Sequence, residues 1–432
     1  MLDFTQLETT FSGKIVSSSH PEYDDSRKVY NANIDKRPQA ILYCENEADV
    51  ISAVNFARES NSLIAVRCQG HNGSGYSICN DGIVIDLSQI KYTRVDNENN
   101  TVRVGAGCKW EDVDNATAVF GKAVSSGVVS STGVSGLTLG GGHGYISRGY
   151  GLAIDNLVEV DIVLSDGSYV KASENLNSDI FWGIRGGGGN FGIITSFVFN
   201  MAPVHDVFCG LMAWDLKDIQ ETFTWYDKLM KSARNDLYGF FAIQTIPPAP
   251  PFPDELHNQK FCGVVWCYYG PKEEFEEAWA PIKAYCEECP PIMDGTHWAT
   301  LRELNATFNE LYPAGDQWYW KGDYFDNITS EVIEIHNRKI QDVPTWKSAM
   351  HLYPINGVCH DISADAMAWN DRQSNYSMVI VGVSQDAKDF DDIKSWATSY
   401  WRELNPHSSL TGSYVNWMMP DEDKNRVKSA YG

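Results

Sequence analysis

The chain has 432 residues, 43% of them hydrophobic and 21% charged, which is typical of a globular protein with roughly two or three domains. Its formal net charge of −23 excludes nucleic acid and anionic membranes as main partners, because both require a basic surface. No apolar run approaches the roughly 18–20 residues of a membrane span, and the N-terminus lacks the pattern of a signal peptide. We therefore expect a cytoplasmic protein, with a mature secreted form as the alternative.

The first hundred residues predict alternating helices and strands. Residues 1 to about 40 are expected to form an arm that leads into the first unit. Asn46 is a typical N-cap, and apolar residues at helical spacing predict a helix over 47–59. Further elements are expected along the chain: strands over 62–67, 83–87 and 101–105, and a helix over 110–120. This alternation favours an α+β unit.

A glycine-rich loop follows the strand over 62–67. The stretch VRCQGHNGSGYS, Val66 to Ser77, carries His71 among three glycines, with Arg67 four residues before it. Glycine allows a flat ligand or a phosphate to approach the backbone closely. By itself the pattern leaves two interpretations open: an ordinary hydrogen-bonded histidine, or a ligand-binding loop.

A second glycine-rich segment, SSTGVSGLTLGGGHGY, runs from Ser130 to Tyr145. The wider stretch 125–145 has too little periodicity to predict a helix and too few charges to predict a disordered linker. One interpretation is a solvent-exposed loop. The other is a backbone that presses against a flat or charged ligand.

A third segment, DIFWGIRGGGGNFGIITSF, runs from Asp179 to Phe197 and follows a predicted hairpin over 158–173. Its glycines resemble the GxGxxG fingerprint of dinucleotide-binding folds. That fingerprint must follow a strand and open a helix, whereas residues 192–197 are expected to form a strand. A Rossmann site is therefore not expected here.

The composition changes near Pro203, where glycine becomes rarer and aromatic residues more frequent. Helices are expected over 217–233 and 272–288, and the proline-rich stretch 247–255 predicts a surface loop. The aromatic run 318–320 predicts either core packing or a platform for a flat or sugar-like substrate. The stretches MHLYP (350–354) and ADAMAWNDR (364–372) are expected to flank a strand pair. The lone CxxC pair, Cys286 and Cys289, indicates thiols and no metal site.

In this order and spacing, the three glycine-rich segments resemble the berberine-bridge-enzyme-like branch of the vanillyl-alcohol-oxidase flavoproteins. The resemblance covers nearly the whole chain and implies an α+β fold. It implies a two-part, PCMH-type FAD-binding domain over 1–204, with a core from about 34, and a substrate domain over 205–405 with an antiparallel sheet covered by helices. Residues 406–432 are then expected to return to the FAD-binding domain, with a segment after 421 that resembles the start of a truncated C-terminal helix.

The resemblance also assigns candidate FAD contacts. It implies a covalent bond from His71 to the 8α carbon of the flavin ring. Relatives with a second covalent bond use a cysteine at a position that is Val129 or Ser130 here, so only one bond is expected. The implied contacts are Arg67, Cys68, Gln69, Gly70, His71, Asn72, Gly73, Ser74, Thr132, Gly133, Ser135, Gly136, Gly140, Gly141, Gly142, Gly192 and Ile194.

The resemblance places candidate catalytic residues at Tyr353, Tyr414 and Trp417. Tyr353 matches a position just before a proline that supplies a base in relatives. Trp417 replaces the second aromatic residue of a Tyr-x-Asn-Tyr motif and has no ionisable group, so it cannot abstract a proton. Tyr353 is the favoured base, and the alternatives are Tyr414, His351 or His360.

The expected activity is that of an FAD-dependent oxidase. Hydride would leave an alcohol or amine carbon of a small secondary metabolite or sugar-like molecule, and molecular oxygen would reoxidise the flavin to give hydrogen peroxide. One alternative is a dehydrogenase that uses another acceptor. The other is a flavin-binding protein without turnover, which the tryptophan at position 417 and the short C-terminus suggest.

Overall fold

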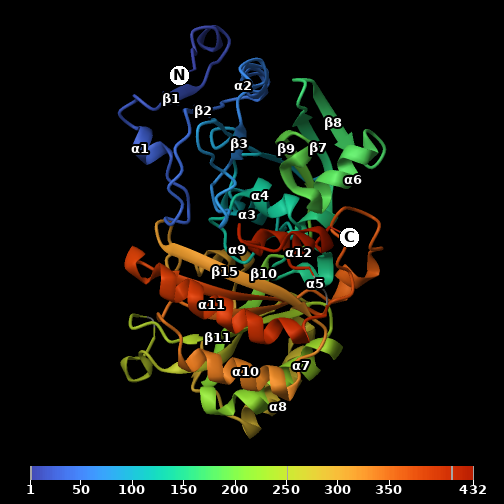
Figure 1. Ribbon diagram of the computed structural model, residues 1–432. Helices are drawn as coiled ribbons and strands as arrows, with labels where there is room; N and C mark the ends of the chain where they lie inside the picture. Colours follow the sequence, from blue (N-terminus) through green and yellow to red (C-terminus); the bar gives the residue numbers. More distant parts are fainter. Residues whose placement is uncertain (1, 251, 410–411, 432) are drawn as a thin grey trace.

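The computed structural model describes residues 2–250, 252–409 and 412–431. It has two lobes (Figure 1). We call the part with the four- and five-stranded sheets the first lobe, and the part with the eight-stranded sheet the second lobe. The predicted α+β class, with a two-part flavoprotein domain and an antiparallel sheet under helices, is confirmed.

The four-stranded sheet of the first lobe has the order β1-β2-β4-β3, with β2, β3 and β4 parallel. Its helix α2 begins after Asn46, whose side chain accepts a hydrogen bond from the Asp49 amide at 3.1 Å. The N-terminal stretch expected as an arm contains β1, which pairs with β2. The elements are β1 (Lys14–Ser17), α1 (Tyr23–Ser26), β2 (Ala40–Tyr43), α2 (Glu47–Glu59), β3 (Ile64–Arg67) and β4 (Ile83–Asp86).

The five-stranded sheet is antiparallel, with the order β5-β6-β9-β7-β8. Val102 and Phe197 of this sheet share one buried core with Leu42 and Ile85 of the other, which makes the two sheets one body. The elements are β5 (Thr93–Asp96), β6 (Thr101–Gly105), α3 (Trp110–Ala118), α4 (Val134–Leu139), α5 (Ser147–Tyr150), β7 (Leu157–Val163), β8 (Tyr169–Ser173), α6 (Ser178–Gly187) and β9 (Ile193–Asn200).

One expectation for the first lobe was wrong. Residues 125–145 were expected to lack a helix, but α4 forms within them. The helix is short, and its N-cap Gly133 leads into Val134, Ser135 and Thr138, which are buried. Tertiary packing therefore stabilises a turn that the local sequence favours only weakly.

The second lobe is an antiparallel sheet with the order β13-β10-β12-β11-β16-β17-β15, and β14 pairs with β10. Helices α7, α8, α10 and α11 lie on the side away from the first lobe (Figure 1). The strands are β10 (Asp206–Asp215), β11 (Leu237–Thr245), β12 (Lys260–Tyr268), β13 (Met293–Asp294), β14 (His297–Thr300), β15 (Gln317–Phe325), β16 (Ala349–Pro354) and β17 (Tyr376–Ser384). The helices are α7 (Ile219–Ser232), α8 (Phe275–Glu288), α9 (Leu301–Ala306), α10 (Ser330–Gln341) and α11 (Phe390–Leu404).

The alternation of side chains along β16 decides which residues face the first lobe. Met350 and Leu352 enter the core under the helices, whereas Tyr353 joins a separate cluster on the opposite face of the sheet. The stretch 350–354, expected to flank a strand pair, is therefore itself a strand, and it pairs with β11 and β17. The period of two places His351 on the same face as Tyr353.

The segment 412–431 returns to the junction between the lobes. It contains a short 3₁₀ turn, Val415–Trp417, and helix α12 (Lys424–Ser429), which lies at the level of the junction between the lobes in Figure 1. Arg426 of α12 pairs with the buried Asp323 of β15, with 2.8 Å between Nη1 and Oδ1. This ion pair fixes the returning segment against the second lobe.

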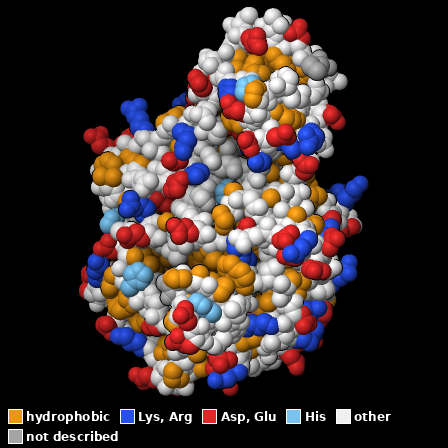
Figure 2. All heavy atoms as spheres, turned by 90° about the vertical axis from the view of Figure 1, so that its left-hand side faces the viewer, with side chains coloured by type: hydrophobic (Ala, Val, Ile, Leu, Met, Phe, Trp, Pro, Cys, Tyr) orange, Lys and Arg blue, Asp and Glu red, His pale blue; other side chains and the backbone are white. Residues whose placement is uncertain are grey.

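The surface is acidic overall but mixed in detail. On the face in Figure 2, lysine and arginine side chains are interspersed with aspartate and glutamate. Among the described residues, none of the helices combines the length and the apolar character that a bilayer span requires.

Candidate active site

The loop after β3 presents His71. Gly70 and Gly75 both have φ of +69°, which glycine adopts without the penalty that a Cβ would bring. The His71 ring stacks on Tyr30, with 4.1 Å between ring centroids and 19° between planes. Burial, together with the charge of Lys109, lowers the pKa of His71 to about 4. The imidazole is therefore neutral at pH 7 and retains a nucleophilic nitrogen.

Arg67, a candidate FAD contact, uses its guanidinium within the protein. Its Nε lies 2.5 Å from Asp86 Oδ2, and its Nη1 donates to the Ser26 carbonyl at 2.8 Å. Both side chains of this ion pair are buried. The geometry indicates that Arg67 anchors the end of β3 and so holds the loop in place.

The remaining loop candidates connect the loop to other segments. Gln69 Nε2 donates to the Gly107 carbonyl at 2.7 Å, and Asn72 Oδ1 accepts from the Tyr76 amide at 2.9 Å. Ser74 Oγ donates to the Met418 carbonyl, which joins the His71 loop to the returning segment. Burial raises the pKa of the Cys68 thiol to about 12, although a hydrogen bond with Ser135 opposes the shift.

The second glycine-rich segment packs against the His71 loop. A Cβ at Gly133 would lie 3.0 Å from Gln69 Cγ, so this position has little room for a side chain. Ser135 Oγ donates to the Ala106 carbonyl at 2.7 Å, and the Thr132 carbonyl accepts from the Trp110 amide at 3.0 Å. Gly136, by contrast, faces open space, with nothing within 4 Å of an added Cβ.

The third segment turns sharply before β9. Gly192 has φ of +152°, and an added Cβ would lie 2.6 Å from the Val163 carbonyl oxygen. Ile194 is buried in β9, opposite Ile162. Gly188 and Gly189 face open space beside α4. This segment therefore combines positions that packing reserves for glycine with positions that leave the backbone accessible.

Tyr353, Tyr414 and Trp417 come together around His143. The His143 ring centroid lies 5.1 Å from that of Tyr353, 4.7 Å from Tyr414 and 5.0 Å from Trp417. These side chains come from β16, the returning segment and the turn after α4. The structure thus gathers all the candidate catalytic residues at the junction of the lobes.

His143 is the site residue that the sequence reasoning missed. It is 6% exposed, and neither ring nitrogen has a hydrogen-bond partner among the described residues. Burial lowers its pKa to about 3, so the ring is neutral. The available signal was a lone titratable side chain inside GGGHG, where every neighbour is glycine.

The two tyrosines have different surroundings. The Tyr414 oxygen accepts hydrogen bonds from the Gly142 amide at 2.8 Å and from Asn416 Nδ2 at 2.9 Å. Burial nevertheless raises the pKa of Tyr414 to about 12. The Tyr353 hydroxyl lies 3.0 Å from His351 Nδ1, and burial raises its pKa well above the ordinary value. Tyr414 thus holds the Gly140–Gly142 turn, whereas Tyr353 contacts a basic nitrogen.

Gly140 and Gly141 complete the turn beneath this cluster. An added Cβ at Gly140 would lie 2.3 Å from Asn416 Oδ1, and one at Gly141 would lie 3.0 Å from Tyr414. The backbone of the turn therefore lies directly against the side chains of Asn416 and Tyr414 in the returning segment.

His360 and Arg372 have other contacts. His360 Nε2 lies 2.9 Å from the Ser374 carbonyl. Arg372 forms a bidentate pair with the buried Asp155, at 2.7 and 3.0 Å. The structure favours a structural role for both.

The aromatic run of β15 is divided between the two faces of the sheet. Trp318 stacks near Tyr30 and Tyr312, at 5.3 and 5.5 Å, and Trp320 lies against Gly73. Tyr319 points to the opposite side and donates to Asp421 at 2.9 Å. The indoles of Trp318 and Trp320 pack against the His71 loop, which fits a role in core packing. Their N–H groups have no hydrogen-bond partner among the described residues, which fits a platform for a substrate, so both roles remain predictions.

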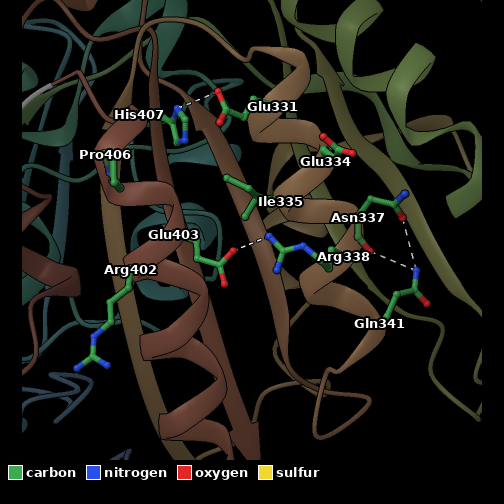
Figure 3. A pocket seen from close by; sticks show the side chains of 10 residues that line it. All are labelled: Glu331, Glu334, Ile335, Asn337, Arg338, Gln341, Arg402, Glu403, Pro406 and His407. Carbon is green, nitrogen blue, oxygen red and sulfur yellow. Dashed lines mark hydrogen bonds and ion pairs between the residues drawn. The ribbon is translucent and has the colours of Figure 1, made fainter.

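A groove between α10 and α11, with a volume of about 580 Å³, lies on the helical side of the second lobe (Figure 3). Arg338 pairs with Glu403 across it at 2.5 Å, and His407 lies 4.0 Å from Glu331. The groove is on the far side of the sheet from His143, so we do not assign the chemistry to it.

The residues present fit FAD. The loops around His71 and Gly142 contain glycines with positive φ, and the backbone at Gly136 faces open space that FAD could occupy. The buried ring of His143 has no hydrogen-bond partner among the described residues, so a ligand atom could provide one.

Comparison with known proteins shows what the chain is similar to. The FAD binding domain family matches residues 38–173. An FAD-linked oxidoreductase of Dictyostelium discoideum is 29% identical over 95% of this chain and 88% of its own length. The solved structure of Physcomitrella patens BBE-like 1 superposes with a TM-score of 0.86 at 20% identity, covering 100% of this chain and 94% of that one. The 6-hydroxy-D-nicotine oxidase of Arthrobacter nicotinovorans gives a TM-score of 0.85 at 19% identity, covering 98% and 92%.

The matched family and the fold together indicate a protein built on an FAD-binding domain of the PCMH type. The chain resembles FAD-linked oxidoreductases along nearly its whole length and shares the fold of the berberine-bridge-enzyme-like proteins.

Proposed function

We propose that this oxidoreductase is an FAD-dependent oxidase that removes a hydride from the alcohol or amine carbon of a small secondary metabolite or sugar-like substrate. The observation that carries the proposal is the convergence of Tyr353, Tyr414 and Trp417 on His143, whose ring nitrogens have no hydrogen-bond partner in the part of the chain that the structure describes. Bound FAD would supply the acceptor for the hydride, and molecular oxygen would reoxidise it to give hydrogen peroxide. The division into domains near Pro203 is part of the same proposal.

In this proposal a side chain of the protein accepts the proton of the substrate hydroxyl or amine. Tyr353 accepts the proton of the substrate hydroxyl or amine as the hydride leaves the same carbon. Tyr414 holds the Gly142 backbone in place through its hydroxyl oxygen. Trp417 packs edge-on to Tyr414, at 5.1 Å and 88°, and shields the cluster from water.

We propose that His71 binds FAD through a single covalent bond. Support comes from its neutral ring and from its position in a loop bonded to the returning segment through Ser74. Relatives with a second bond have cysteine at the position of Val129 or Ser130, and neither residue has a thiol that could form such a bond. Ser130 Oγ accepts a hydrogen bond from Asn309 Nδ2 at 2.9 Å.

The test is substrate-driven bleaching of the flavin under argon, followed by admission of air. Bleaching and rapid recolouring support an oxidase. Bleaching with slow recolouring in air supports the dehydrogenase alternative. A flavin that binds but that no alcohol or amine of a broad screen bleaches supports the alternative without turnover.

A further inference from the structure

Gln244, His351 and Tyr353 form a line of polar side chains on the face of the sheet that meets the first lobe. His351 and Tyr353 are two residues apart on β16 and so share that face. His351 is paired with Ala242 of β11, which makes Gln244 its diagonal neighbour. Diagonal neighbours lie about 7–8 Å apart at the backbone, within reach of long side chains.

Two distances show which of these three side chains donate and which accept hydrogen bonds. His351 Nδ1 lies 3.0 Å from the Tyr353 hydroxyl oxygen, and His351 Nε2 lies 3.4 Å from Gln244 Oε1. An amide oxygen can only accept, so the imidazole hydrogen must lie on Nε2. The lone pair is then on Nδ1, and the Tyr353 hydroxyl donates to it.

We propose that His351 takes the phenolic proton of Tyr353 during the reaction, and that Gln244 is the positioning residue that holds His351 in the tautomer able to do so. This inference rests on the proposed function, in which Tyr353 meets the substrate. Neither Gln244 nor the pair with His351 follows from the family resemblance.

The step balances in atoms and electrons. The O–H or N–H bond of the substrate breaks, and its proton forms a new O–H bond on Tyr353. The original O–H bond of Tyr353 breaks, and that proton forms an N–H bond on His351 Nδ1. The electrons of the broken O–H or N–H bond form the second bond between that atom and the carbon. The hydrogen of the substrate C–H bond leaves with its electron pair as hydride, which bound FAD would accept, so the substrate would lose two electrons and the flavin would gain them.

The surroundings of Tyr353 explain why an immediate proton acceptor is needed. Its ring contacts Phe240, His143 and Trp417, and no lysine or arginine stabilises its phenolate in the part of the chain that the structure describes. A free phenolate would therefore be unfavourable in this buried place. Burial also lowers the pKa of His351 to about 4, so the imidazolium is a transient carrier of the proton, and its Nε2–H remains bonded to Gln244.

The first test is nitrogen-15 NMR of the histidine rings in the FAD-loaded protein, without substrate. The chain has 10 histidines, and loss of one signal in His351→Asn identifies His351. We expect Nε2 protonated and Nδ1 unprotonated near pH 7. A hydrogen on Nδ1 would overturn the proposal, because His351 would then donate to Tyr353.

The second test changes the amide. Gln244→Leu removes the acceptor, and we expect the Nδ1–H form of His351 to become populated. Gln244→Glu keeps an acceptor and should keep the Nε2–H form. Thr245→Val, a buried neighbour on the opposite face of β11, is the matched control and should change nothing. An unchanged tautomer in folded Gln244→Leu would contradict the role of Gln244.

The last measurement separates this inference from the proposed function. Once a substrate bleaches the flavin, Gln244→Leu should slow anaerobic flavin reduction roughly tenfold at saturating substrate, a modest part of a general-base effect. If the tautomers are as expected but Tyr353→Phe reduces flavin at the normal rate, the base assignment in the proposed function fails. If Tyr353→Phe is slow but His351→Asn is not, the transfer to His351 fails.

Discussion

The two sides of the site are built in different ways. On the first lobe, the His71 loop and the Gly140–Gly142 turn present mainly backbone, and their side chains bond within the protein, as Gln69 and Ser135 do. On the second lobe, β16 presents side chains, His351 and Tyr353, from a regular strand. Backbone cradles need glycine at fixed positions and leave a pattern in the sequence, whereas a strand face can carry different chemistry without changing the fold.

The largest expected effect concerns the first-lobe side. His71→Ala should abolish the covalent bond, because alanine has no nucleophilic nitrogen. After acid precipitation, the yellow colour should stay in the pellet for the wild-type protein and move to the supernatant for the variant. Colour in the wild-type supernatant would show that FAD binds without the bond and would contradict our assignment of His71.

The next effect concerns the second-lobe side. Tyr353→Phe should lower the rate of anaerobic flavin reduction by roughly 10²- to 10⁴-fold, the usual contribution of a general base. Stopped-flow absorbance at saturating substrate measures this rate. Tyr376→Phe, a buried tyrosine under the helices, is the control for a lost hydroxyl, and its rate should remain near that of the wild type.

Two glycine variants on the first-lobe side distinguish a glycine that close packing requires from a glycine that would contact the cofactor. Gly73→Ala places a Cβ 2.1 Å from Trp320 Cζ2 and should lower the free energy of unfolding by about 1–3 kcal/mol. Gly136→Ala has open space within α4 and should stabilise the apoprotein by about 0.5–1 kcal/mol. If Gly136 contacts FAD, as the family resemblance implies, the same variant should weaken FAD binding. Denaturant unfolding and FAD titration provide the measurements, and unchanged FAD affinity would remove Gly136 from the site.

The last expected effect concerns a contact between the two lobes and depends on pH. Asp114 of α3 accepts a hydrogen bond from Asn305 of α9 at 2.9 Å, and burial raises the pKa of Asp114 to about 7. Because the folded pKa exceeds the unfolded one, the stabilising contribution is complete below about pH 4 and is lost as the pH rises through 7. Asp114→Asn should therefore gain about 1–3 kcal/mol at pH 8 relative to the wild type and little at pH 4. Thermal melts at both values test this, and an equal difference at both would contradict the shift.

The sequence predicted the first lobe well for physical reasons that are local. The apolar spacing and the Asn46 cap predicted α2 at its observed bounds, and the glycines before β9 excluded a Rossmann helix. Helix α4 was not predicted, because it is short and is stabilised mainly by the burial of its side chains.

By itself, the sequence determined the α+β class, the resemblance to flavoproteins and the positions of the glycine-rich segments, because backbone geometry restricts which residues can occupy such segments. Only the tertiary structure decided that His143 lies against Tyr353, that Arg67 is paired with Asp86, and that Gln244 reaches His351. These contacts join residues that are separated along the chain. They depend on how the strands pair and on which face each side chain occupies in the folded protein, and a local sequence pattern does not reveal either.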